Sequence, residues 1–186
     1  MVCAAELEPV APGVFLWRAY DASIKTDLFS TGLKIPSGTY LVDPIPLASD
    51  ATGPLTNVAG IIVTNKNHER SASDFASQFQ VPTHSDASQS FPQGLTAIPI
   101  EGAAPGEIAV YWKGGGGVMV IGDALINFDP YGFTFLPAKY CTNHKLMRRS
   151  LAKLLDYSFE RMLFAHGTPI QSRAQQRLGA LLKGEE

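Results

Sequence analysis

The chain has 186 residues, enough for one domain with a sizeable core and too few for two. Hydrophobic residues make up 45% and charged residues 17%, a globular balance, and no apolar run approaches the roughly 20 residues of a membrane helix. Residues 1–10 carry acids where an export signal needs a basic and then an apolar stretch. Because the only cysteines, Cys3 and Cys141, lack metal or redox spacing, we expect a cytoplasmic single domain over 1–186 with free thiols.

The net charge of −2 is unevenly spread, since nine of the fifteen Lys and Arg residues lie between Lys139 and the C-terminus. A basic tail can bind nucleic acid, but most of these cations fall on the polar faces of two predicted helices. We therefore expect neither nucleic acid nor membrane as a partner, and the sequence leaves the oligomeric state open. The helical cations are Lys145, Arg148, Arg149, Lys153, Arg173 and Arg177.

The front of the chain reads as short strands separated by Pro and Gly. One short helix, Ser73–Phe79, is predicted among them, with two phenylalanines four residues apart. The glycine run Lys113–Gly117 lacks the residues of a phosphate-binding loop, so we interpret it as a hairpin turn. The predicted strands are Val14–Tyr20, Thr26–Lys34, Thr39–Val42, Gly60–Val63, Val81–Thr83, Leu95–Ile100, Glu107–Trp112 and Val118–Ile121.

The back of the chain changes to a helical period. A helix capped by Thr142 or Asn143 precedes a strand at Met162–Ala165, and a last helix covers Ser172–Leu182. Two strand-rich halves, each followed by helix, suit two sheets packed face to face with helices outside, an α+β arrangement. The pattern alone does not separate this layering from other α+β folds.

The stretch Ile61–Arg70 carries the most chemical information. Its β-branched residues predict a buried strand, and the polar run that follows lies where such folds place their chemistry. It resembles the metallo-β-lactamase superfamily, whose strand ends in Thr-His-x-His-x-Asp-His and supplies ligands for two metal ions. Four further segments resemble the family in the same order: Tyr40–Asp43, Gly102–Ile108, Val118–Leu125 and Phe164–Pro169.

The resemblance implies a four-layer αββα sandwich with two mixed sheets face to face, helices outside and a cleft along one sheet edge. The family's first metal takes three histidines, whose places here hold Asn65, Asn67 and Ala103, and an aspartate that is retained as Asp123. Asparagine amides are poor zinc ligands and alanine offers none. We therefore expect the first metal position to be lost.

The second metal position is implied to hold Glu69, Arg70, Asp123 and His166. Glu69, Asp123 and His166 could hold one divalent zinc, manganese or iron ion, whereas the cation of Arg70 opposes it. We expect no metal cofactor, with this single atypical metal as the alternative. In the metal's absence we expect Arg70 to hydrogen-bond to Asp123 or Glu69 and balance the two carboxylates.

Two further features have both a plain and a functional interpretation. His68 occupies a place that the family leaves variable, so we favour an ordinary loop histidine; its pKa range also suits acid–base work. The aromatic segment Phe128–Phe135 is expected near the cleft mouth, where it either stacks on a ligand or covers core. Asp43 is expected to have a structural role.

Three hypotheses of function follow. The first is a pseudo-hydrolase without metal that binds a small molecule or a partner in the remnant cleft. The second is an active hydrolase with the single metal, which would activate water. The third is a metal-free acid–base enzyme with His68 or His166 working against Asp123, and these three side chains are the tentative catalytic residues. Because the family topology brings these strand ends together, we expect Asn65, Asn67, Glu69, Arg70, Asp123 and His166 to converge on one cleft.

Overall fold

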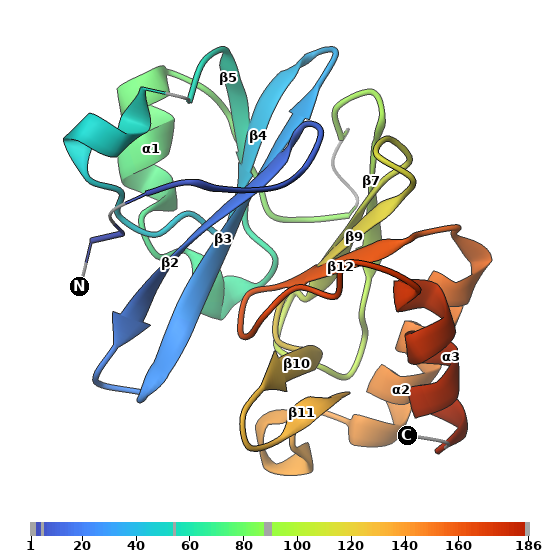
Figure 1. The fold of residues 1–186 in the computed structure, drawn as a ribbon. Helices are drawn as coiled ribbons and strands as arrows, with labels where there is room; N and C mark the ends of the chain where they lie inside the picture. Colours follow the sequence, from blue (N-terminus) through green and yellow to red (C-terminus); the bar gives the residue numbers. More distant parts are fainter. Residues whose placement is uncertain (1–2, 5, 54, 88–90, 185–186) are drawn as a thin grey trace.

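The structure is a computed structural model that describes residues 3–4, 6–53, 55–87 and 91–184 (Figure 1). The chain forms two large mixed sheets that pack face to face, and helices cover their outer faces. This arrangement confirms the expected four-layer αββα fold. Among the described residues, no helix has the length and apolar character needed to span a membrane. Cys3 and Cys141 are both unpaired.

The first sheet has six strands in the order β1-β2-β3-β4-β5-β6. Its first four strands pair antiparallel, and the last two add in parallel, so that β4 and β5 end at the same edge. Helix α1 (Ala72–Phe79) packs against this sheet. The strands are β1 (Glu8–Ala11), β2 (Val14–Asp21), β3 (Thr26–Ile35), β4 (Gly38–Val42), β5 (Val58–Ile62) and β6 (Thr83–His84).

The second sheet has four strands in the order β12-β9-β8-β7, and β12 runs parallel to β9. A separate hairpin of two strands, β10 and β11, follows β9 along the chain. The strands are β7 (Leu95–Pro99), β8 (Ile108–Trp112), β9 (Val118–Ile121), β10 (Leu125–Phe128), β11 (Gly132–Phe135) and β12 (Arg161–Phe164). The outer helices are α2 (His144–Ala152) and α3 (Ala174–Lys183); the short 3₁₀ turns are η1 (Ser49–Thr52), η2 (Lys66–His68), η3 (Ala138–Tyr140) and η4 (Lys153–Asp156).

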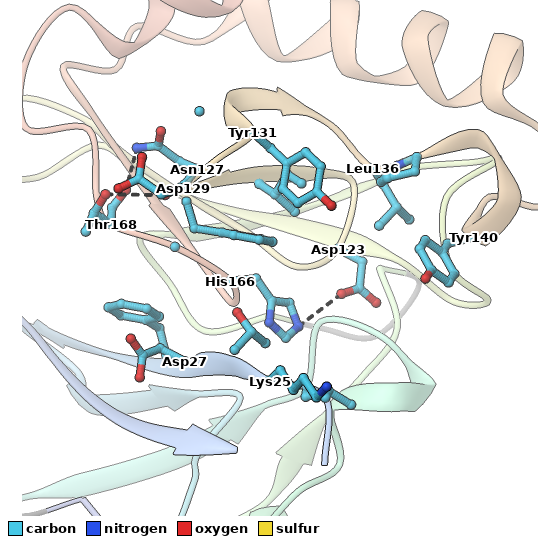
Figure 2. A pocket seen from close by; sticks show the side chains of 18 of the residues that line it. Lys25, Asp27, Asp123, Asn127, Asp129, Tyr131, Leu136, Tyr140, His166 and Thr168 are labelled. Carbon is cyan, nitrogen blue, oxygen red and sulfur yellow. Dashed lines mark hydrogen bonds and ion pairs between the residues drawn. The ribbon is translucent and has the colours of Figure 1, made fainter. Parts of the chain in front are cut away.

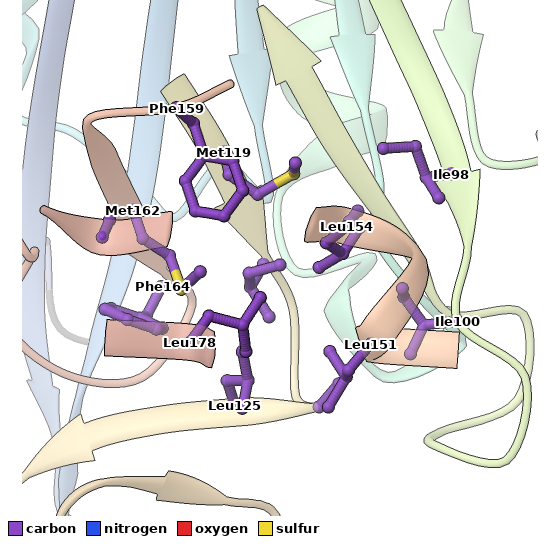
Figure 3. Close-up of a cluster of buried hydrophobic side chains, with 14 of the residues drawn as sticks. Ile98, Ile100, Met119, Leu125, Leu151, Leu154, Phe159, Met162, Phe164 and Leu178 are labelled. Atoms are coloured by element: carbon purple, nitrogen blue, oxygen red, sulfur yellow. The ribbon is translucent and has the colours of Figure 1, made fainter. Parts of the chain in front are cut away.

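Three apolar clusters separate the four layers. Phe75 of α1 belongs to the cluster against the first sheet, and Leu33 and Val120 belong to the cluster between the sheets. The third cluster fills the space between the second sheet and helices α2 and α3, where Met119 and Leu151 are fully buried (Figure 3). Each sheet therefore buries both faces, which explains why the central strands of the second sheet, β8 and β9, are almost entirely apolar.

The element predictions hold for most strands and for all three helices, with ends shifted by a few residues. Three strands were missed. Strand β1 is a short edge strand that contains Pro9, and β10 and β11 surround the turn Asp129–Tyr131 inside the aromatic segment. The glycine run after β8 forms the predicted hairpin turn, since β8 and β9 pair antiparallel across it.

The central cluster gives a direct test of the two-sheet core. Leu163 of β12 is almost fully buried between the sheets, so Leu163→Ala should lower the free energy of unfolding by about 2–5 kcal/mol. Ile24 is exposed, and Ile24→Ala should change the free energy of unfolding by less than about 0.5 kcal/mol. Urea unfolding measures both, and equal small effects would contradict the described packing.

Candidate functional site

The site lies where several strands end at one edge of the paired sheets. Asp43 follows β4, the turn η2 follows β5, and Asp123 and His166 follow β9 and β12. Because β4 and β5 are parallel neighbours, as are β9 and β12, each pair delivers its following residues to the same place. Figure 2 shows Asp123 and His166 facing one another across this region.

His68 is the centre of the site. Its imidazole is buried, with Nδ1 3.0 Å from Asp43 Oδ2 and Nε2 3.1 Å from Asp123 Oδ1. The Thr64 hydroxyl, 2.9 Å from the same Nδ1, donates to Asp43 Oδ2. The Asn65 side chain caps η2 by accepting from the backbone N–H of Asn67, and the turn leaves His68 buried while Asn67 is exposed.

Asp123 joins His68 to His166. The Nε2 atom of His166 lies 3.4 Å from Asp123 Oδ1, the same oxygen that faces His68. One nitrogen from each histidine and one oxygen of Asp123 all lie within 4.8 Å of one another. The three side chains therefore present two imidazoles and a carboxylate to a single point.

Asn65 and Glu107 support this group from behind. The Asn65 amide donates to Asp123 Oδ2 at 3.1 Å and to Glu107 Oε2 at 2.6 Å. The other oxygen of Glu107 accepts from the backbone N–H of Ala124 at 3.0 Å. Asp123 is thus held both through its side chain and through the backbone that follows it.

The buried charges pair with one another. Burial alone would lower the pKa of His68, but its interaction with Asp43 and its hydrogen bonds to Asp123 and Asp43 outweigh burial and raise that pKa to about 9. Burial also opposes ionisation of Asp43 and Asp123, yet the histidine contacts hold the pKa of each below its ordinary value. In the metal-free protein His68 is therefore an imidazolium between two carboxylates.

The pKa shifts of two neighbouring groups, Glu107 and His166, favour their neutral forms. Burial, followed by repulsion from Asp123, raises the pKa of Glu107 to about 8. Burial lowers the pKa of His166 despite its hydrogen bond to Asp123. Near neutral pH, Asp43 and Asp123 therefore carry negative charges that His68 and Arg70 offset.

The hydrogen-bond partners of Arg70 differ from those that the sequence predicted. Its guanidinium donates to the backbone carbonyls of Phe29 at 2.7 Å, Asp43 at 3.1 Å and Ala165 at 3.5 Å. Within the described part of the chain it makes no hydrogen bond to Asp123 or Glu69, so that prediction was wrong. The physical reason is that three backbone carbonyls accept hydrogen bonds from the guanidinium. Its positive charge interacts more strongly with the carboxylate of Asp43 than with that of Asp123.

Glu69 and Ala103 lie apart from the group formed by His68, Asp123 and His166. Glu69 is exposed and lines a second cavity of about 810 Å³, together with Arg70, Asn65 and Glu107. Ala103 is fully buried in the cluster beneath helix α2. The residues that meet Asp123 and His166 are instead His68 and Asn65, and Asn67 lines the same cavity as Asp123.

Sequence reasoning did not find the central place of His68 or the roles of Thr64 and Glu107. The available signal was a histidine one helical turn after the threonine that ends a buried strand. A second signal was the aspartate Asp43 at the end of the neighbouring strand. Neither signal gives the tertiary contact, which joins residues 25 positions apart.

A cavity of about 1180 Å³ opens above the site, and Asp123 and His166 form part of its lining. Its walls include the β2–β3 turn, the β10–β11 hairpin and η3. The aromatic segment Phe128–Phe135 was expected either to contact a ligand at the cleft mouth or to cover the core. Phe128 and Tyr131 line the cavity, whereas Phe133 is buried in the core.

Comparison with solved structures identifies the fold. The chain aligns with DIM-1 metallo-β-lactamase over 98% of its length and 100% of that chain, with 13% identity and a TM-score of 0.71. A metallo-β-lactamase from Pontibacter korlensis aligns over 96% and 98%, with 12% identity and a TM-score of 0.72. FIM-1 from Pseudomonas aeruginosa, in its mono-zinc form, aligns over 98% and 96%, with 12% identity and a TM-score of 0.69.

No protein-family model matches the chain, and no curated protein matches it either. At this level of identity the structural likeness defines the fold alone. The protein has the metallo-β-lactamase fold. Within the part of the chain that the structure describes, His68, Asp123 and His166 come together as a group of side chains that could hold a metal ion.

The raised pKa of His68 predicts how stability depends on pH in chelator-treated protein. Unfolded His68 loses its proton near pH 6.5, whereas the folded protein holds it to about pH 9. The free energy of unfolding should therefore fall by about 3 kcal/mol as the pH rises between these values. Glu107, whose pKa is raised from 4.5 to about 8, acts in the same direction.

Urea unfolding at several pH values measures this loss. The variant His68→Gln should be less stable near neutral pH and should show a shallower decline, because the raised pKa of His68 no longer contributes while that of Glu107 remains. Parallel profiles for the wild type and the variant would contradict the ion-paired imidazolium.

Proposed function

We propose that the protein is a metal-dependent hydrolase whose cleft holds one divalent ion on His68, Asp123 and His166. The observation that carries the proposal is the separation of their ligand atoms, 3.1 Å and 3.4 Å from the shared Asp123 oxygen. Ligands at zinc distances of about 2.0–2.1 Å in a tetrahedron lie about 3.3–3.4 Å apart. The two distances to the Asp123 oxygen match this spacing, and the two histidine nitrogens lie within 4.8 Å of one another, so the three side chains can reach one ion.

The surrounding hydrogen bonds support the same assignment. An imidazole that ligates through Nε2 needs an acceptor for its Nδ1–H, and Asp43 provides that acceptor for His68. Asn65 holds the second oxygen of Asp123, which leaves the first oxygen directed at the two histidines. Such outer hydrogen bonds orient metal ligands and raise their basicity.

The open side of the group faces the larger cavity. Three protein ligands and one accessible position are typical of catalytic rather than structural zinc. A bound ion would polarise the reacting carbonyl or phosphoryl group and lower the pKa of an attacking water. Asn67, which is exposed and lines the same cavity, can orient a substrate by hydrogen bonding.

One observation favours a second candidate, a pseudo-hydrolase that binds a small molecule or a partner without metal. The charges of Asp43 and Asp123 are already offset by the His68 imidazolium and by Arg70. In that state a proton on Nε2 of His68 takes the place of the ion. The two candidates therefore differ in whether a metal displaces this proton.

Calorimetric titration of chelator-treated protein with zinc or manganese tests the displacement. We expect about one ion per chain and release of about one proton near pH 7.5, because His68 must lose Nε2–H to bind. The affinity should rise by about tenfold per pH unit between about pH 6.5 and pH 8.5. Activity toward a panel of ester and amide substrates should be lost with chelator and restored by metal.

Matched variants identify the ligands. His68→Gln, Asp123→Asn and His166→Gln should each abolish stoichiometric binding, whereas Glu69→Gln should retain it because Glu69 lines the other cavity. Loss of binding in Glu69→Gln would instead support the ligand set expected from the sequence motif, Glu69, Asp123 and His166. Absence of any stoichiometric binding by the wild type would favour the pseudo-hydrolase.

A further inference from the structure

The exposed apolar side chains of the described residues gather at one place. Four large hydrophobic residues are exposed there: Tyr20, Ile24, Tyr131 and Tyr140. All four line the cavity that also contains Asp123 and His166. Single exposed apolar residues are ordinary on a protein surface, but their confinement to one cavity indicates a binding role.

Three of these four residues are tyrosines, and they come from separate elements. Tyr20 lies near the end of β2, Tyr131 lies in the β10–β11 turn, and Tyr140 lies in η3. Figure 2 shows Tyr131 above Asp123 and His166 and Tyr140 beside Asp123, with Lys25 below His166. The three tyrosines therefore line the same cavity as Asp123 and His166.

Local contacts hold the rings of Tyr131 and Tyr140 while leaving them accessible. Tyr131 packs edge to face on Phe128, with centroids 5.7 Å apart and an interplanar angle of 87°. The Nζ atom of Lys139 lies 4.7 Å from the centroid of Tyr140. Even so, Tyr131 and Tyr140 remain 63% and 61% exposed. Each tyrosine has ring surface available to a ligand.

We propose that the cavity selects esters or amides that carry a planar aromatic group, which contacts Tyr131 and Tyr140. The scissile carbonyl then lies at Asp123 and His166. Tyrosine offers a large rigid surface, and aromatic pairs gain attraction beyond the area they bury. The cavity, at about 1180 Å³, has room for a ligand of drug size. The proposal rests on the proposed hydrolase function only for the identity of the reacting group.

Binding of a matched pair of uncleaved probes to chelator-treated protein tests the proposal. The probes are N-(2-naphthyl)acetamide and its fully saturated decahydronaphthyl counterpart, which share one carbon skeleton. Calorimetry should give about tenfold tighter binding of the naphthyl amide, because two aromatic contacts each contribute a factor of about 2–13. Equal affinities would overturn the proposal.

Paired variants separate ring contacts from apolar burial. The double variant Tyr131→Leu, Tyr140→Leu should lose most of the naphthyl preference, whereas Tyr131→Phe, Tyr140→Phe should retain it. Both residues are exposed, so thermal melting should confirm that both variants stay folded. Retention of the preference by the leucine variant would overturn the proposal.

This experiment is independent of the metal titration. The probes are neither cleaved nor bound through a metal in chelator-treated protein, so a failure to bind zinc leaves the naphthyl preference intact. Conversely, a protein that binds zinc and hydrolyses esters but shows no naphthyl preference would keep the proposed function and refute the aromatic selectivity.

Discussion

The contact on which the site depends is the imidazole of His68 between the carboxylates of Asp43 and Asp123. Asp43 follows a strand of the first sheet and Asp123 follows a strand of the second, so the imidazole joins the two halves of the fold. Burying two carboxylates is costly unless a cation and hydrogen bonds offset their charge. His68 supplies both, and its Nε2 is also the atom that can exchange a proton for a metal ion.

The backbone around this contact is tied across the same boundary. The Phe29 N–H donates to the carbonyl of Ala165, and the guanidinium of Arg70 donates to the carbonyls of both residues. Asp43 and Arg70 themselves have positive φ values of 48° and 39°, which non-glycine residues rarely adopt. The side chains of both residues form hydrogen bonds within the site, and such bonds can hold an unfavourable backbone conformation in place. Arg70 therefore links the two sheets through hydrogen bonds to backbone carbonyls, and among the residues that the structure describes its guanidinium does not hydrogen-bond to the carboxylate of Asp123.

Much of this architecture is readable from the sequence, because buried strands in two face-to-face sheets are apolar on both faces. The alternation of strands and helices and the ordered motifs around Asp43, Asp123 and His166 predicted the layers and the cleft. The motif alignment was less informative about Glu69 and His68, which are adjacent in the chain but lie in different surroundings. The 3₁₀ turn capped by Asn65 buries His68 and leaves Glu69 exposed, and such a turn depends on tertiary contacts.

The central claim is that two carboxylates hold His68 as an imidazolium whose Nε2 proton can be replaced by a metal ion. Nitrogen-15 NMR of the histidine side chains in chelator-treated protein reports the protonation of each ring nitrogen directly. We expect His68 to be doubly protonated near neutral pH and to titrate near pH 9, and we expect zinc to remove the Nε2 proton while Nδ1–H remains. A His68 that is neutral near pH 7.5, with a pKa at or below about 6.5, would contradict the central claim.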